Sequence, residues 1–356
     1  MAVKSSGSPL AFSEIEAEFG QNNDRDLGEY RVSQTVGGLS NQPLDTGIPQ
    51  SGEIKFSDFY TKRLNVIIDY HSGSTENRPT VAKTRYDAAA GTGTHTVIGG
   101  FATRPANSGG TKTRIHVNKT IGSSNSNVNN CAVRTGTGWN AGTILTIEIG
   151  SSGKIYGAGG NGGEAGTSDG DANGENGGSG SSGLGVQFSG TTVINNGIIS
   201  AGYGGGGGGG YRKVEREELF SGPVYAASGG GGGGGQGLPA GEGIDGGADG
   251  TTTAGGNGGN GGENNQAHGG GGGGGGSNGT GGEGGNNNDG GNGTSSSGGN
   301  GASGTHTGSI EGENNVQGSG GTGGSNGAAI RRTSGITVNI TNNATITGVT
   351  NATGVS

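Results

Sequence analysis

The residues of this chain that could perform chemistry are few and far apart. Gly157-Ala158-Gly159-Gly160-Asn161-Gly162 matches the G-x-G-x-x-G pattern with which a loop cradles a phosphate. The match has little specificity in a chain with 94 glycines among 356 residues, and no Walker-type lysine follows it. Asp169-Gly170-Asp171-Ala172-Asn173-Gly174 matches the opening of a calcium-binding loop, but Gly180 occupies the position of the bidentate acid. We therefore predict a solvated turn and no metal site.

The histidines and the single cysteine do not form a catalytic set. No Ser/His/Asp arrangement or paired carboxylates can be assembled from the sequence. Cys131 has no second cysteine to pair with, which excludes an intramolecular disulfide and a cysteine-based zinc site, and we expect a buried thiol. The five histidines are scattered without the spacing of metal ligands: His71, His95, His116, His268 and His306. We predict that the protein is not an enzyme and carries no cofactor.

Residues 211–225 have the strongest potential for binding. This stretch holds three of the five basic residues and three of the five aromatic residues found from Gly157 onward. Tyr, Phe and Arg contribute disproportionately to the energy of protein interfaces. The same residues would also suit a lid packed over neighbouring structure. Both interpretations, binding loop and packing lid, fit the sequence.

The elements that must position this stretch are unusual, because glycine replaces the ordinary core. Of the 94 glycines, 20 lie in residues 1–156 and 74 in the rest, and no aromatic residue follows Tyr225. Arrays of Gly-Gly-X, such as residues 255–262, repeat every three residues. That period fits a left-handed helix of the polyproline II type, with about three residues per turn and no internal hydrogen bonds. The sequence predicts a bundle of such polyglycine II helices, joined by backbone hydrogen bonds.

Composition alone would predict a flexible linker instead. Glycine loses more backbone freedom on folding than any other residue. The three-residue register is, however, kept within discrete tracts that polar segments separate, which favours order. We expect substitutions of tract glycines to be severe and substitutions at the X positions to be mild.

Charge argues against nucleic acid as a partner. Residues 1–156 carry 15 basic and 13 acidic residues, and the remainder carries 5 and 15. Phosphate backbones require clustered Lys and Arg, and single strands require interleaved aromatics. No run of about 20 apolar residues exists, so no membrane insertion is expected, and the N-terminus lacks the apolar region of a secretory signal.

Two β patterns complete the organisation. Alternating apolar residues at 114–121 and 143–149 predict a β-rich neck domain over residues 63–156. A unit of strand, Asn/Gly turn and strand recurs at 147–156, 193–199 and 338–348, which predicts stacked β-rungs supporting the bundle. We therefore expect a mainly β fold with N-terminal docking repeats (1–62), the neck (63–156) and a polyglycine II domain with distal loops and a terminal β-rung (157–356).

The N-terminal repeat consists of Pro9-Leu10-Ala11-Phe12-Ser13-Glu14-Ile15 and Glu53-Ile54-Lys55-Phe56-Ser57-Asp58-Phe59, with a looser copy at 26–30. Each good copy predicts an extended piece that runs into a serine-capped helical turn. These units are too short to fold alone, so we expect them to dock on a partner or on each other, although a locally ordered N-terminal arm is the alternative. The attachment candidates are Leu10, Phe12, Ile54, Phe56 and Phe59.

The strand, Asn/Gly turn and Gly-Gly-X pattern over residues 143–356 resembles the glycine-rich adhesins at the tips of long tail fibres in T-even-like bacteriophages. The Ser57-Asp58-Phe59-Tyr60 unit is similar to short repeats of phage tail and baseplate proteins. The resemblance implies a virion protein of the tail or tail fibre that acts at the host cell surface, together with other phage tail proteins. Its partner would be a bacterial surface receptor, either an outer-membrane protein or a polysaccharide.

In that family, loops between the glycine tracts contact the receptor. Carried over, the resemblance implies contact loops that begin at Thr167, Tyr211, Leu238, Glu263, Asn286 and Thr305. The receptor-binding candidates are Tyr211, Arg212, Lys213, Arg216, Phe220, Tyr225, His268 and His306. Two alternatives remain. One is a structural tail-fibre or baseplate component whose bundle is a spacer or an assembly contact, and the other is an ice-binding protein, which the docking repeats disfavour.

Overall fold

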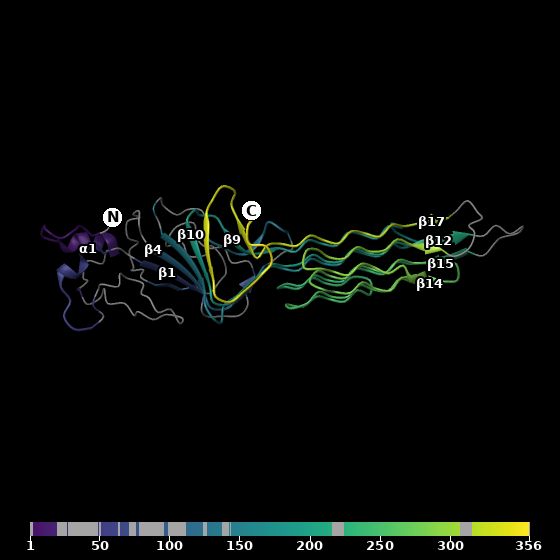
Figure 1. Cartoon of the computed structure of the whole chain (residues 1–356), viewed down its shortest axis with the longest axis horizontal. Coiled ribbons are helices and arrows are strands. Elements are labelled where there is room, and N and C mark those ends of the chain that lie inside the picture. Colours follow the sequence, from purple (N-terminus) through teal and green to yellow (C-terminus); the bar gives the residue numbers. More distant parts are fainter. Residues whose placement is uncertain are drawn as a thin grey trace, which may run out of the picture.

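The structure is a computed structural model that describes residues 3–19, 27, 49, 51–62, 65–70, 76–77, 96–98, 112–123, 127–136, 142, 144–215, 224–306 and 315–355. Within these residues the chain is mainly β, with one short α-helix. The molecule is elongated: helix α1 lies at one end and a bundle of extended glycine tracts forms the other (Figure 1). None of the described helices has the length and apolar character needed to cross a membrane.

The two good copies of the N-terminal repeat adopt the same local structure, in helix α1 (Phe12–Phe19) and 3-10 helix η2 (Phe56–Phe59). In each copy the acidic side chain accepts a hydrogen bond from the backbone N–H three residues before it. Glu14 bonds to Ala11 and Asp58 bonds to Lys55, both at 2.7 Å. The expected serine cap is therefore wrong, because the helical turn starts one residue before Ser13 and a carboxylate satisfies the free N–H. The looser copy at 26–30 lies outside the described residues, except for Leu27.

The middle of the molecule is a three-sided parallel β-helix, in which the chain visits three sheets in turn. The first sheet has the order β19-β10-β7-β4-β1-β3, the second β2-β5-β8-β11-β20 and the third β21-β18-β9-β6. Neighbouring strands in these sheets are parallel, apart from the antiparallel pair β1 and β3. The strands are β1 (Asn65–Tyr70), β2 (Glu76–Asn77), β3 (Thr96–Ile98), β4 (Lys112–Val117), β5 (Thr120–Gly122), β6 (Cys131–Arg134), β7 (Ile144–Ile149), β8 (Lys154–Tyr156), β9 (Ser182–Val186), β10 (Thr191–Asn195), β11 (Ile198–Ser200), β18 (Ile330–Arg332), β19 (Val338–Asn342), β20 (Thr345–Thr347) and β21 (Ala352–Thr353).

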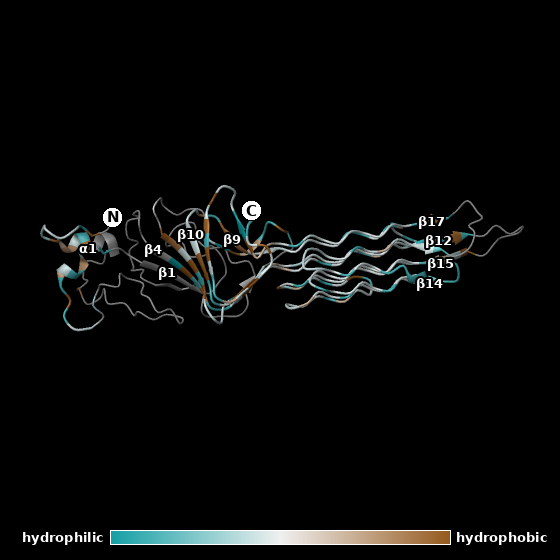
Figure 2. Ribbon diagram, viewed as in Figure 1, coloured by the Kyte–Doolittle hydropathy of each residue, from teal (hydrophilic) through white to brown (hydrophobic). Residues whose placement is uncertain are grey.

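Alternation along these strands builds the core of the β-helix. In β7 and β10 every second side chain is buried, as expected for strands with one face inward. The register stacks like residues from coil to coil, so that Ile121, Ile155, Ile199 and Ile346 lie in one row. Figure 2 shows the apolar residues gathered in these strands, whereas the glycine tracts are nearly neutral. Each coil thus buries aliphatic side chains against the next one.

The glycine bundle consists of two insertions into consecutive coils of this β-helix. Residues 157–181 leave the second sheet after β8 and return to the third at β9. Residues 201–329 leave after β11 and return at β18, one coil further along. The paired rungs β7-β8, β10-β11 and β19-β20 are those expected from the strand–turn–strand repeat, and they do stack in parallel.

Hydrogen bonds between the tracts follow a three-residue period. In the tract 202–211, residues 202, 205, 208 and 211 donate to the carbonyls of 181, 178, 175 and 172. Every third residue from 203 donates to segment 230–236, and Gly207 and Gly210 donate to segment 299–302. The same tract accepts from segments 160–166, 270–276 and 318–327. Six neighbours therefore surround it, and backbone bonding replaces side-chain packing.

Position in the bundle explains the two kinds of glycine tract. The uninterrupted runs 204–210, 229–235 and 269–276 are buried throughout, whereas in 255–262 the X residues Asn257 and Asn260 are exposed. Side chains fit only where a tract has a free edge. At X positions, asparagine oxygens also accept backbone N–H groups of the adjacent tract, as between Asn257 and Thr280 (3.0 Å) and between Asn260 and Glu283 (2.9 Å). These asparagines thus contribute to the contacts between tracts, so we predict that their substitution costs more than that of X residues without such a bond.

The expected domain boundary at residue 156 coincides with the end of β8. Strands β9, β10 and β11 nevertheless pair with β6, β7 and β8, which lie before this point. Strands β18, β19 and β20 pair in turn with β9, β10 and β11. The sheets thus continue across residue 156, and only the tracts between the strands leave the β-helix.

Candidate functional site

Two small sheets cap the far end of the glycine bundle (Figure 1). One has the order β13-β12-β17 and the other β14-β15-β16. Their strands are β12 (Arg212–Glu215), β13 (Val224–Ala227), β14 (Glu263–Asn264), β15 (Ala267–His268), β16 (Thr305–His306) and β17 (Val316–Gln317). Each strand lies directly at the end of a glycine tract, where the chain gains side chains and can form a sheet again. The rigid tracts therefore set the position of this far end, which we call the tip.

The inner face of the first tip sheet forms a small core. Val214 and Ala227 are buried against Ala267 of the second sheet, and Tyr225 packs at the edge. Arg212 lies on the same face and is only 2% exposed. Its Nη1 donates to the carbonyl of Val316 (3.4 Å) and to Oε1 of Gln317 (3.5 Å).

Arg212 is a buried cation with incomplete pairing. Among the described residues, its Nε and Nη2 have no hydrogen-bond partner. Burial lowers the pKa of this guanidinium, which nevertheless stays charged at neutral pH. An incompletely paired buried charge is costly, and such groups concentrate at functional sites.

The outer face of the same sheet carries Lys213, Glu215, Val224, Ala226 and Val316. Lys213 lies between Ala226 on one neighbouring strand and Val316 on the other. Val224 is 50% exposed and Val316 37% exposed, so two large apolar side chains face solvent beside a lysine. This pattern, exposed apolar groups beside a cation on one face of a sheet, suits contact with another molecule.

Two histidines lie in the second tip sheet, on opposite faces of neighbouring strands. His268 is buried and faces the 3-10 helix η3 (Gly285–Asn287), with Nδ1 3.9 Å from Oε1 of Glu263. His306 pairs with Ala267 and is half-buried on the side of Arg212. Burial lowers the pKa of His306, and the nearby Arg212 and His268 lower it further. His306 is therefore neutral at pH 7.

The structure brings six of the eight candidate binding residues together at the tip. Tyr211, Arg212 and His268 are buried, so they support the tip, whereas Lys213, Tyr225 and His306 are half-buried. Burial raises the pKa of the Tyr211 hydroxyl, with a contribution from Asp169. Arg216 and Phe220 lie outside the described residues.

Most, but not all, of the segments expected to contact a receptor lie near this end. The turn that begins at Thr167 lies beside Tyr211, whose N–H donates to Ala172. The segments that begin at Glu263, Asn286 and Thr305 contribute β14, η3 and β16. Leu238, however, lies at the opposite end of the bundle, where its carbonyl accepts from Ser123 of the β-helix. The alternation of tracts and turns could not distinguish the two ends of the bundle.

The attachment candidates divide between the surface and the core. Phe12 and Phe56 contact each other edge to face, with ring centroids 6.0 Å apart, and Phe56 is 41% exposed. Leu10 and Ile54 are partly buried against the main core, whereas Phe59 is fully buried within it. Leu10, Phe12, Ile54 and Phe56 can thus form a surface, and the buried Phe59 stabilises that surface from the core.

Sequence analysis missed the contributions of Val224 and Val316 to the outer face of the tip. They are separated by 92 residues, and only the pairing of β13 and β17 with β12 brings them together. Short apolar positions inside polar segments gave no usable signal. Among the described residues, no group of three or more His, Cys, Asp or Glu side chains is arranged to hold a metal ion.

Comparisons with known proteins identify the family. Residues 89–279, more than half of the chain, match the family described as "Phage tail fibre adhesin Gp38". No curated protein matches the chain in sequence. Among solved structures, the gp37-gp38 adhesin tip complex of the bacteriophage S16 long tail fibre aligns with 98% of this chain and 100% of its own, at 17% identity and a TM-score of 0.32. On the family match, the chain belongs to the Gp38 phage tail fibre adhesins and is a component of the virion tail.

Proposed function

We propose that this adhesin recognises a host cell-surface receptor through the tip of its glycine bundle. The observation that carries the proposal is the outer face of the first tip sheet, where Val224, Val316 and Lys213 are grouped at the extreme end of an elongated molecule. Tyr211, Arg212 and His268 hold the strands in place from within.

The bundle serves this function as a polyglycine II lattice. The three-residue hydrogen-bond period and the six neighbours of tract 202–211 support this assignment. A lattice held by backbone bonds leaves its tip strands with little freedom to lose, which lowers the ordering cost of receptor binding. The binding energy then depends on the side chains at the tip and not on the glycines.

The opposite end of the molecule attaches the adhesin to another protein of the tail fibre. Phe12 and Phe56 form an aromatic pair whose outer part is exposed, and Leu10 and Ile54 flank it. Exposed aromatic pairs of this kind are typical anchors of protein interfaces. The binding and attachment ends thus lie as far apart as the chain allows (Figure 1).

Charge substitution on the outer face tests the receptor site. We expect Val224→Glu and Val316→Glu to reduce phage adsorption to the host, because each removes a buried apolar contact and places an anion in the interface. Burial of one valine contributes about 1.5 to 3 kcal/mol, which corresponds to roughly a 10- to 150-fold loss of affinity. Adsorption rates of phages that carry each variant measure the effect.

Thr252→Glu is the matched control. Thr252 is exposed in a turn at the other end of the bundle, where its carbonyl accepts from Gln236. This variant adds the same charge far from the tip and should adsorb as the parent phage does. Normal adsorption of both valine variants, with correctly assembled fibres, would remove the outer face from the receptor site.

A further inference from the structure

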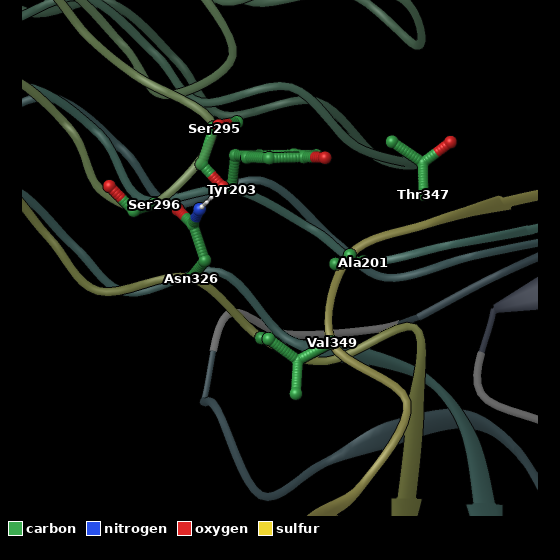
Figure 3. A pocket seen from close by; sticks show the side chains of 9 residues that line it. Ala201, Tyr203, Ser295, Ser296, Asn326, Thr347 and Val349 are labelled. Carbon is green, nitrogen blue, oxygen red and sulfur yellow. Dashed lines mark hydrogen bonds between the residues drawn. The ribbon is translucent and has the colours of Figure 1, made fainter.

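A cavity of about 430 Å³ lies where the last coil of the β-helix meets the base of the glycine bundle. Three separate segments of the chain line it. The first is the start of tract 201–203, the second combines a bundle turn (Ser295, Ser296) with Asn326 and Gly327, and the third is the turn after β20, residues 347–349. Figure 3 shows Tyr203, Asn326, Thr347 and Val349 on different sides of the hollow. The volume falls within the range of about 300 to 1,000 Å³ typical of small-molecule sites.

The polar groups of the cavity are uncharged, and one of them, the Asn326 amide, is fixed in position. Asn326 is held at both ends, because its Oδ1 accepts from the N–H of Gly204 (2.9 Å) and its Nδ2 donates to the carbonyl of Ser295 (3.0 Å; Figure 3). Among the described residues, the hydroxyls of Ser295 and Thr347 have no hydrogen-bond partner. No Asp, Glu, Lys, Arg or His lines the cavity. It therefore offers free hydroxyls and no charge to an occupant.

The apolar groups of the cavity come from Val349, Ala201 and the buried ring of Tyr203. Val349 is 55% exposed, the largest exposed fraction among the large apolar residues of the described chain. Gly348 separates it from Thr347 with a φ of +116°, and a Cβ at Gly348 would lie 2.8 Å from the Cβ of Ala201. Glycine at this position thus keeps the turn close to the bundle without closing the hollow.

We propose that this cavity binds a neutral saccharide unit. Hydroxyl side chains on a rigid frame match the hydroxyls of a sugar, and Val349 with its apolar neighbours matches the C–H face of a pyranose ring. The absence of cationic side chains disfavours phosphorylated or acidic sugars, which would lose hydration without gaining a partner. The site lies at the base of the bundle, away from the tip strands, and it does not depend on the role of the tip.

Saturation-transfer NMR and calorimetry on the whole protein test the proposal. The probes are glucose, galactose, mannose, rhamnose, N-acetylglucosamine and their common disaccharides, with glucose 6-phosphate and glucuronate as charged counterparts. We expect saturable binding of at least one neutral sugar in the range of roughly 0.1 to 10 mM, and weaker binding of its charged counterpart. Each of Ser295→Ala and Thr347→Val should weaken binding about two- to tenfold.

Two further variants separate loss of the site from loss of folding. Ser295→Tyr fills the hollow from an exposed turn and should abolish binding without lowering the melting temperature. Thr341→Val removes an exposed hydroxyl from β19, outside the cavity, and should leave binding unchanged. Failure of every neutral sugar to bind, or binding that survives Ser295→Tyr, would overturn the proposal.

The source of the sugar follows from the same measurements. Binding of an oligosaccharide from the host surface polysaccharide, and competition by it, would indicate a surface glycan as the ligand. Binding restricted to free monosaccharides would indicate a site for a soluble sugar. Receptor binding at the tip is measured separately by phage adsorption, so either proposal can fail without the other.

Discussion

Gly206→Ala is the sharpest test of a bundle packed at backbone distance. Gly206 lies in the central tract and is buried. A Cβ at this position would lie 1.9 Å from the carbonyl oxygen of Gly273, and real Cβ contacts below 3.0 Å essentially never occur. The obstructing atom belongs to backbone, so it cannot rotate away as a side chain would. Segments 204–210 and 270–276 would have to separate by about 1 Å.

Three hydrogen bonds join these two segments and would be stretched beyond bonding distance. The N–H groups of residues 270, 273 and 276 donate to the carbonyls of 210, 207 and 204 at 3.0, 2.7 and 2.7 Å. At about 0.5 to 1.5 kcal/mol net for each bond, their loss costs about 1.5 to 4.5 kcal/mol. Alanine offsets about 0.4 to 1 kcal/mol of this by restricting the unfolded chain. We therefore expect a net destabilisation of about 0.5 to 4 kcal/mol.

Gly262→Ala is the matched control, because the nearest atoms to its Cβ, the backbone N and O of Ser228, lie at 3.5 Å, an ordinary contact distance. This variant should be neutral or slightly stabilising. Calorimetric unfolding measures the stability of both proteins, and hydrogen exchange of the peptide covering 202–211 reports on the bundle itself. Equal stability and equal exchange in the two variants would refute backbone-distance packing of the central tract.

Three further predictions address other parts of the molecule. Asn260→Ala should destabilise the bundle by about 1 kcal/mol, since it removes the acceptor of a backbone N–H. Glu283→Ala should not, because the exposed Glu283 side chain makes no hydrogen bond with the described residues, and thermal unfolding distinguishes the two variants. The folded-state pKa of His306 lies below its ordinary value of 6.5, so the unfolded chain takes up the proton first as the pH falls. The free energy of unfolding should therefore decrease as pH drops below about 7, and level off once the folded form is also protonated. His306→Gln should flatten this dependence in melting curves between pH 5 and 8, and an unchanged slope would exclude His306 as its origin. Phe12→Ser and Phe56→Ser should weaken attachment of the adhesin to its fibre, measured by co-purification, while melting temperatures that fall as far as the attachment does would point to a folding defect instead.

Much of the architecture could be predicted from local sequence. The alternation in 143–149 predicted strand β7, and the recurring strand–turn–strand unit predicted rungs that stack in parallel, because both signals lie within a few neighbouring residues. The two N-terminal copies likewise adopt one local structure, although the cap is a carboxylate and not a serine. The tip was harder to predict, since Val316 joins Val224 only through pairing with β12.

The sequence by itself determined that the glycine tracts after Tyr225 could not have an ordinary core, since they contain no aromatic side chain. The sequence also determined the three-residue period. Only glycine permits contact at backbone distance, so two glycines in every three residues leave two edges of a tract able to pack against neighbouring tracts. Tertiary structure alone decided which tracts lie inside, which end of the bundle carries each turn, and where the β-helix meets its base. These depend on hydrogen bonds between distant segments, such as that between Asn176 and Thr322, which are 146 residues apart. A pattern that repeats every three residues cannot specify which tracts become neighbours.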